Sequence, residues 1–168
     1  MSKSSVVTAR QAPVAGEAKV STGSLTIQGE TFEVVSHERV ALIDLTDTVM
    51  RRAHESGVRE GTVSLWSMQT TCTLFINESQ QALHADILQF LDETVDRHKY
   101  YRHNDPALSD CDRQNADSHL KALLLGHSLT LQIAGGELVL GQWQRVLMGE
   151  LDGPRTRKVR VQIMGIVA

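Results

Sequence analysis

Apolar positions follow a period of two near both ends of the chain and a helical period between them. Residues 25–35 alternate loosely around Gln28-Gly29, which predicts a β-hairpin. Apolar residues recur at helical spacing over 40–53 and predict a first helix. Residues 61–68 and 72–77 are rich in Val, Thr, Phe and Trp, which is typical of strands.

The second half of the chain predicts two more helices and a further set of strands. Apolar residues at i, i+4, i+7 and i+8 over 83–91 predict the second helix, and 115–125 predicts the third, ending at Gly126. Alternation then returns at 129–133, and Gly135-Gly136 suits a tight hairpin turn. The rest of the chain is expected to form a return strand over 138–151, a turn at Gly153-Pro154 and a last strand over 159–163.

This order of elements predicts an α+β fold. Strands lie at both ends with about three helices between them, which favours antiparallel hairpins with helices packed on the sheet. Residues 100–113 are polar and contain Asn104-Asp105-Pro106, so we expect an ordered loop there. Residues 1–19 are small, polar and aperiodic. We expect a flexible tail without a signal peptide, followed by one domain over 20–168.

Composition excludes several classes of protein. The chain has 168 residues and a net charge of −3, and its pI is about 6.1, so no basic excess points to a nucleic-acid partner. The apolar runs are too short to span a membrane. Two cysteines, Cys72 and Cys111, cannot build a disulfide scaffold and suit a reducing cytosol, which predicts a cytoplasmic protein.

Two of the seven histidines stand out as candidates for chemistry. His119 lies on the third predicted helix between Ala116 and Leu123, so its ring should point inward or to the edge of a cleft. A core histidine bonded to a backbone carbonyl is the alternative, and spacing alone favours it. His103 lies in a polar loop, a common place for functional groups. The others are expected on the surface or in a loop: His37, His54, His84, His98 and His127.

Two further segments carry unusual polar residues. Gln69 follows a strand and would share its inner face with Leu65. Glu150 and Asp152 share a face at a strand end, and a turn there is followed by Arg155 and Arg157, whose guanidinium groups suit phosphate. A salt-bridged hairpin is the alternative. No zinc-protease, paired-cysteine, phosphate-loop or dinucleotide motif is present.

Five ordered blocks resemble those of the YjbQ-like family, also called the secondary thiamine-phosphate synthase enzyme family. The resemblance runs from about residue 20 to the C-terminus. The blocks are Thr70-Thr71-Cys72 through Asn77-Glu78, Tyr101 through Pro106, Asn115 through Leu120, Gly136 through Gln144, and Glu150 through Arg155.

The resemblance implies a compact α+β domain with a mostly antiparallel, β-sandwich-like core that assembles as a homotrimer. It also implies thiamine-phosphate synthase activity, in which a hydroxymethylpyrimidine diphosphate is joined to a thiazole phosphate and pyrophosphate is released. The expected partner is therefore a small phosphorylated metabolite, with no nucleic acid and no membrane.

One position departs from the family pattern. The family has His-Thr-Thr where this chain has Gln69-Thr70-Thr71, so only His103 and His119 remain of three family histidines. A glutamine amide has no accessible pKa, and its oxygen is a poor zinc ligand. Catalysis should be impaired if the site needs a third imidazole. The alternative is a non-catalytic protein that binds a phosphorylated metabolite or a metal ion.

Within the transferase hypothesis each candidate residue has a role. His103 and His119 would exchange protons or bind a divalent metal, Mg or Zn, and Gln69 would occupy the third histidine's place. The leaving diphosphate would be stabilised by a cation and two arginines. The remaining candidates are Arg155 and Arg157 for the diphosphate, Glu150 and Asp152 for the cation or an arginine, Asn77 and Asn115 for orienting substrate, and Trp143, which would stack on a heterocycle or pack in the core.

Overall fold

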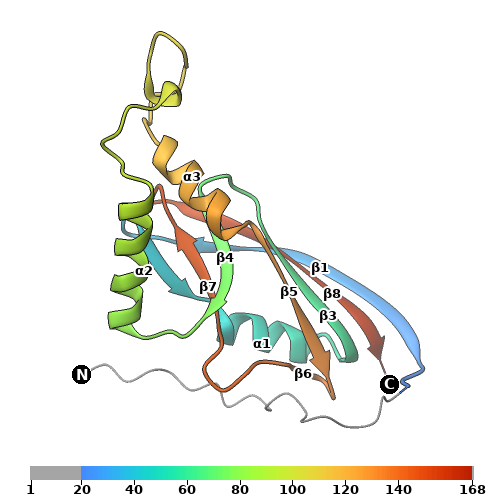
Figure 1. The fold of residues 1–168 in the computed structure, drawn as a ribbon. Coiled ribbons are helices and arrows are strands. Elements are labelled where there is room, and N and C mark those ends of the chain that lie inside the picture. The colour runs from blue at the N-terminus through green and yellow to red at the C-terminus, as the bar shows by residue number, and fades with distance from the viewer. Residues whose placement is uncertain (1–19, 168) are drawn as a thin grey trace.

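The computed structural model describes residues 20–167, and the predicted tail over 1–19 lies outside them. The elements follow the chain in one order (Figure 1). They are β1 (Ser24–Val35), β2 (Ala41–Asp44), α1 (Thr46–Glu55), β3 (Val58–Ser67), β4 (Cys72–Asn77), α2 (Gln81–Thr94), a short 3-10 helix η1 (Arg102–Asn104), α3 (Ala116–Leu125), β5 (Ser128–Ala134), β6 (Glu137–Leu138), β7 (Arg145–Glu150) and β8 (Thr156–Val167).

Eight strands form two antiparallel sheets in the described part of the chain. The larger sheet has the order β1-β8-β3-β5-β6, and the smaller has the order β2-β7-β4. The α+β prediction is therefore confirmed. β8 is the centre of the larger sheet, because it pairs with β1 along its whole length and with β3 on its other side.

The hydrophobic core lies between the sheets and against α1. Alternate residues of β8 are buried, including Val159, Val161 and Ile163, whereas all six residues of β7 are buried. Alternation marks a strand with one covered face, and continuous burial marks a strand covered on both. α1 adds Val49 and Ala53 to this core.

α2 and α3 lie together at the end of the molecule away from α1 (Figure 1). They share a small second core of Leu91, Ala122 and Leu151. The connection between these two helices runs over residues 95–115 and projects from the body (Figure 1). This end of the fold therefore has little apolar packing of its own, and polar contacts hold it to the sheets.

The structure corrects three predicted elements. Residues 25–35 form one continuous strand rather than a hairpin, because β8 offers a pairing partner along the whole length of β1. The predicted helix over 40–53 is a strand, 41–44, followed by α1, and the Asp44 carboxylate accepts a bond from the Thr46 amide at the junction. The predicted return strand over 138–151 divides, since β6 ends at Leu138 and β7 joins the other sheet.

Two glycines meet where β3 crosses β8. Gly61 is the register partner of Gly165, and a Cβ on either would lie within 2.7 Å of the other's Cα. Both positions thus need the absence of a side chain for the two strands to approach. The predicted helix stop at Gly126 is also confirmed, and its φ of 87° favours glycine.

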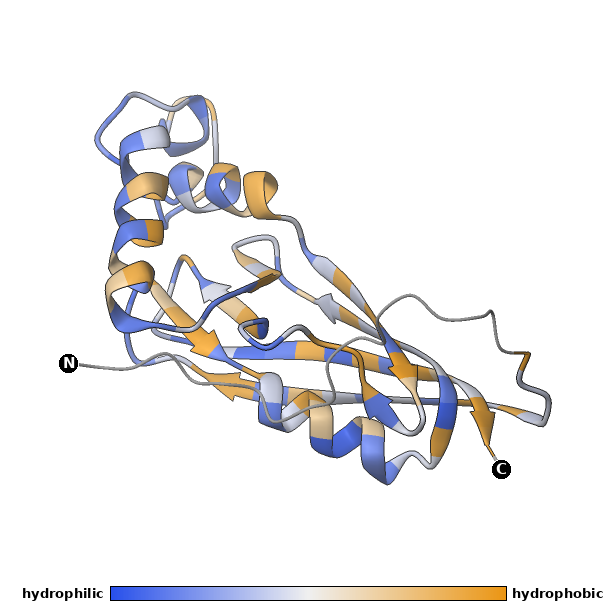
Figure 2. Cartoon of the chain, turned by 60° about the horizontal axis from the view of Figure 1, so that its bottom comes forward, coloured by the Kyte–Doolittle hydropathy of each residue, from blue (hydrophilic) through white to orange (hydrophobic). Residues whose placement is uncertain are grey.

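The exposed face of α3 is apolar. Leu123 is 71% exposed and Leu124 is 56% exposed, and the hydropathy colouring shows this end of the helix as hydrophobic (Figure 2). Of the two apolar neighbours predicted to face inward with His119, Ala116 is buried and Leu123 faces outward. No helix among residues 20–167 is long and apolar enough to cross a membrane.

Candidate functional site

Two histidines predicted from the sequence meet at the projecting end of the fold. The rings of His103, on η1, and His119, on α3, lie with centroids 5.0 Å apart and planes at 86°. The loop is held in this position because the Asn104 side chain accepts a bond of 3.0 Å from the Ala116 amide, the first amide of α3. The local fold therefore pairs an exposed imidazole with a partly buried one.

The pKa of His119 is lowered from its usual value of 6.5. Burial is the largest cause, and the charge of His103 adds to it, while Asp152 and Asp117 act in the opposite direction. Both of the lowering effects disfavour the protonated ring. His119 is therefore a neutral imidazole at neutral pH, able to accept a proton.

We expect the pKa of His119 to rise in a His103→Gln variant, because a like charge is removed, and to remain below 6.5 because burial persists. NMR titration of the imidazole C–H signals measures it, with exposed His54 as a signal that the change should not move. A lowered histidine pKa also means that the unfolded chain binds this proton more readily. Its contribution to stability is therefore complete above pH 6.5 and is lost as the pH falls through the folded value. An unchanged pKa in the variant would contradict the coupling.

Asp152 is the ionised carboxylate of this region. It is 3% exposed and accepts bonds from Arg113 Nε at 2.8 Å and Asn115 Nδ2 at 2.9 Å. Burial pushes its pKa up, but these hydrogen bonds and the charges of Arg113 and Arg155 outweigh burial and bring the pKa below 3.8. Asp152 therefore ties the loop and the start of α3 to the turn after β7.

Two guanidinium groups share this single carboxylate. Arg113 and Arg155 have side chains 46% and 37% exposed, and an Arg155 nitrogen lies 3.7 Å from Asp152. One negative charge between two positive charges leaves an excess of positive charge at a solvent-accessible edge. Exposed arginines with unused N–H groups suit phosphate and carboxylate ligands.

Glu150 and Arg157 lie behind this edge and face each other. Their side chains are 0% and 2% exposed, and Arg157 donates through both Nε and Nη2 to the two carboxylate oxygens. Ser36 Oγ also donates to Glu150, and Thr71 Oγ1 accepts from Arg157. The pair therefore joins the ends of four strands, and Glu150 also accepts from the Asp152 amide.

Gln69 lies in the turn between β3 and β4, two residues before Thr71. Its side-chain oxygen accepts a bond of 3.2 Å from the Lys158 amide, at the start of β8. Within residues 20–167 no hydrogen bond joins Gln69 to either imidazole. The resemblance predicts position 69 beside the two histidines, whereas the hydrogen bond of its side chain is with β8.

Asn77 and Trp143 lie away from the other candidates within one chain. Asn77 is the register partner of Arg145, at the start of β7, whereas Glu150 ends that strand. Five residues of strand span about 17 Å. Trp143 is 47% exposed in the turn before β7. A small substrate held by His119 would therefore not reach either residue of the same chain.

The residues present do not fit a closed zinc site within one chain. Across the described residues no three His, Cys, Asp or Glu side chains converge as metal ligands. Structural zinc needs four ligands and catalytic zinc three. The nearby Asp152 carboxylate is already bonded to Arg113 and Asn115. The two imidazoles alone are fewer ligands than either kind of zinc site needs.

Arg113 and Ser36 are not predicted from the sequence, because each acts through a partner far along the chain. Arg113 contacts Asp152, 39 residues away, and Ser36 contacts Glu150, 114 residues away. Cys111 is a further neighbour, since its thiol lies 3.4 Å from the Asn115 side-chain oxygen. An arginine in a polar loop and a serine after a strand carry no spacing signal that would have found them.

The two free thiols should differ in reactivity. Cys72 is buried, and burial together with the charge of Glu150 raises its pKa to about 12, whereas Cys111 is partly exposed. We expect one equivalent of thiol to react with a disulfide reagent at pH 8 in the folded protein and two after unfolding. A Cys111→Ser variant should lose the fast equivalent. Rapid labelling of that variant would contradict the placement of Cys72.

Comparisons with known proteins agree on one family. A family model described as UPF0047 protein YjbQ-like matches residues 30–166. A UPF0047 protein of Archaeoglobus fulgidus is 45% identical over 129 residues, covering 76% of this chain and 94% of that protein. One of Methanothermobacter thermautotrophicus is 42% identical over 127 residues, covering 76% and 85%.

Solved structures give the same result. The crystal structure of a YbjQ-like protein of unknown function from Sulfolobus solfataricus has a TM-score of 0.79 and 31% identity, covering 84% of this chain and 99% of that one. A hypothetical protein from Aeropyrum pernix has a TM-score of 0.75 and 30% identity, covering 82% and 98%.

Proposed function

Because the chain belongs to the YjbQ-like family of UPF0047 proteins, we propose that the edge around His103 and His119 binds a small phosphorylated molecule. The observation that carries the proposal is the pair of exposed guanidiniums, Arg113 and Arg155, that share the Asp152 carboxylate beside two imidazoles. A phosphate group would accept from the unused N–H groups of both arginines.

The reaction we propose for this site is the thiamine-phosphate synthesis that the family resemblance implies. The C–O bond between the pyrimidine methylene and the diphosphate breaks, and a bond forms from that carbon to the thiazole nitrogen. Negative charge grows on the leaving diphosphate, where Arg113 and Arg155 would stabilise it. His103, which is exposed, would donate a proton to the departing diphosphate. The neutral His119 ring would orient the His103 ring.

Glu150 and Arg157 have a positioning role in this proposal. Because both side chains are enclosed, they would act through the Asp152 amide and the turn that carries Arg155 rather than on substrate. Asn115 would act in a similar way, since its side chain donates to Asp152 at the start of α3.

Product formation and pyrophosphate binding test the proposal separately. The purified chain with both substrates and magnesium should form thiamine phosphate, and His119→Ala should lower the rate by about 10²-fold or more. Calorimetry with pyrophosphate should show weaker binding in Arg155→Met than in Arg51→Met, which removes an exposed arginine on α1. Equal product from wild type and His119→Ala would refute the catalytic role, and equal pyrophosphate binding by both arginine variants would refute the anion site.

A binding protein without turnover is the second candidate, and Gln69 favours it. An amide at this position neither exchanges protons nor binds zinc well. Pyrophosphate binding without product would support this candidate. If Gln69→His then restores product formation, position 69 is the missing catalytic group. If that variant gains no activity, the position is not the cause.

We also propose that copies of this chain assemble as the homotrimer implied by the resemblance. The exposed leucines of α3 support an apolar contact next to His119. Light scattering should give three times the chain mass, and Leu123→Asp should reduce it. Asn77 and Trp143 would then approach a site only from another copy.

A further inference from the structure

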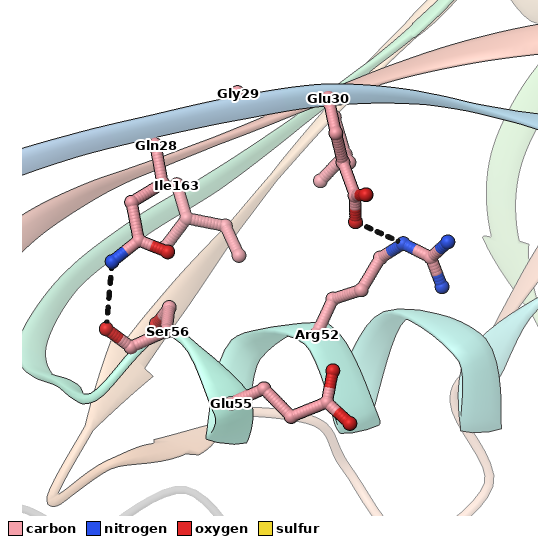
Figure 3. A pocket seen from close by; sticks show the side chains of 8 residues that line it. Gln28, Gly29, Glu30, Arg52, Glu55, Ser56 and Ile163 are labelled. Atoms are coloured by element: carbon pink, nitrogen blue, oxygen red, sulfur yellow. Dashed lines mark hydrogen bonds and ion pairs between the residues drawn. The ribbon is translucent and has the colours of Figure 1, made fainter.

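A hollow lies at the α1 end of the molecule, away from the histidine pair. Its volume is about 290 Å³, and it opens between the inner face of β1, the strand β8 and the last turn of α1 (Figure 3). Val161 and Ile163 of β8 form its apolar floor. A hollow of this size accommodates only a small molecule.

Most of the charge around the hollow is already paired. Glu30 of β1 lies 2.6 Å from Arg52 Nε (Figure 3). The Arg52 guanidinium also stacks at 4.4 Å over the Phe32 ring. These contacts satisfy the positive charge on one side of the opening. They leave Arg52 poorly placed to attract an anion.

Glu55 supplies negative charge that the described chain does not neutralise. It is exposed, it lines the hollow, and no hydrogen bond or ion pair joins its carboxylate to any other residue of 20–167. It is also the last residue of α1, where the helix carbonyls already carry partial negative charge. A carboxylate at this end of a helix favours a nearby cation, and the basic residue of this turn that lines the hollow, Arg52, is already paired with Glu30.

Gln28 adds an oriented acceptor on the opposite wall. Its side-chain nitrogen donates a bond of 2.8 Å to the Ser56 carbonyl, just beyond the end of α1 (Figure 3). Because the nitrogen is used in this way, the amide oxygen remains to accept from a ligand. The Gln28 oxygen and the Glu55 carboxylate are thus unused acceptors at the hollow, which has an apolar floor.

We propose that this hollow binds a small primary alkylammonium ion. The ammonium group would donate to the Gln28 oxygen and, after rotation of the exposed Glu55 side chain, which points along α1 in Figure 3, to the Glu55 carboxylate, and the alkyl stem would lie on Ile163 and Val161. The chemistry of the lining carries this proposal, which does not depend on the function proposed for the histidine site.

Titration with n-butylammonium chloride, followed by amide NMR, tests the proposal. We expect saturable shifts for the Gln28 side-chain amide and for Ser56. Affinity should fall at least fivefold in Glu55→Gln and change less than twofold in Glu33→Gln. Glu33 is the control, because it lies on β1, the strand that carries Gln28, with its side chain on the other face of the sheet. Both changes are at exposed positions, so folding should be retained.

Two added ligands separate a specific site from a general charge effect. Ammonium chloride should shift the same signals only weakly, since it lacks the alkyl stem, and n-butanol should not, since it lacks the charge. Equal effects of ammonium and butylammonium, or equal affinity in the two glutamate variants, would overturn the proposal. So would an absence of saturable shifts in the wild-type chain.

Discussion

Replacing Glu150 with alanine should destabilise the fold by about 3–5 kcal/mol, because the Arg157 charge would remain buried without its partner. Arg157 is 2% exposed and bonds both oxygens of Glu150. The same change removes acceptors from Ser36 and from the Asp152 amide. Urea unfolding monitored by circular dichroism measures the loss.

Two comparisons make this prediction specific. Glu30→Gln breaks an ion pair whose carboxylate is 57% exposed, so we expect a loss below about 1 kcal/mol. The double change of Glu150 and Arg157 to methionine removes both buried charges and should recover most of the stability lost by Glu150→Ala. A double variant as unstable as the single one would show that shape rather than unpaired charge causes the loss.

Gly165→Ala should cost about 3 kcal/mol, at the upper end of the range for overpacked sites. The new Cβ would lie 2.3 Å from the Glu60 carbonyl oxygen and 2.7 Å from Gly61 Cα. Both are backbone atoms, so β3 and β8 would have to separate. Because β8 holds β1 as well, the displacement would extend across the larger sheet.

Gly29→Ala is the matched control on the neighbouring strand β1. Its Cβ would come within 2.5 Å of the Arg160 guanidinium, but that group ends a flexible side chain and can move. We expect a change within about 0.5 kcal/mol. Thermal unfolding of the two variants in parallel compares their melting temperatures. Equal melting temperatures would contradict the close approach of β3 and β8.

The sequence predicts best those helices and turns whose ends are marked by a local signal, such as a glycine. α2 and α3 carry their own apolar spacing, and the turn at Gly135-Gly136 has positive φ at both glycines, 62° and 89°. β1 was mistaken for a hairpin because Gly29 looks like a turn residue, whereas its lack of a Cβ makes room for Arg160. Such a cross-strand requirement leaves no trace in the neighbouring sequence.

The candidate site was predictable in part for the same reason. The pairing of His103 with His119 followed from the family resemblance, and the ring geometry places them together. The bonds that position them join residues far apart in the chain, as Arg113 and Asp152 do. Asn77 and Trp143 are predicted for the same site because they lie in family blocks, but within one chain strand β7 separates them from the histidines.

The two tryptophans lie near opposite ends of β7 and can therefore serve as two separate fluorescence reporters. Trp66 is 57% exposed at the end of β3, three residues before Gln69, and Trp143 lies before the opposite end of β7. In a Trp143→Phe variant, the fluorescence emission of Trp66 alone would report on events near position 69. The converse variant would provide a reference signal that such events leave unchanged.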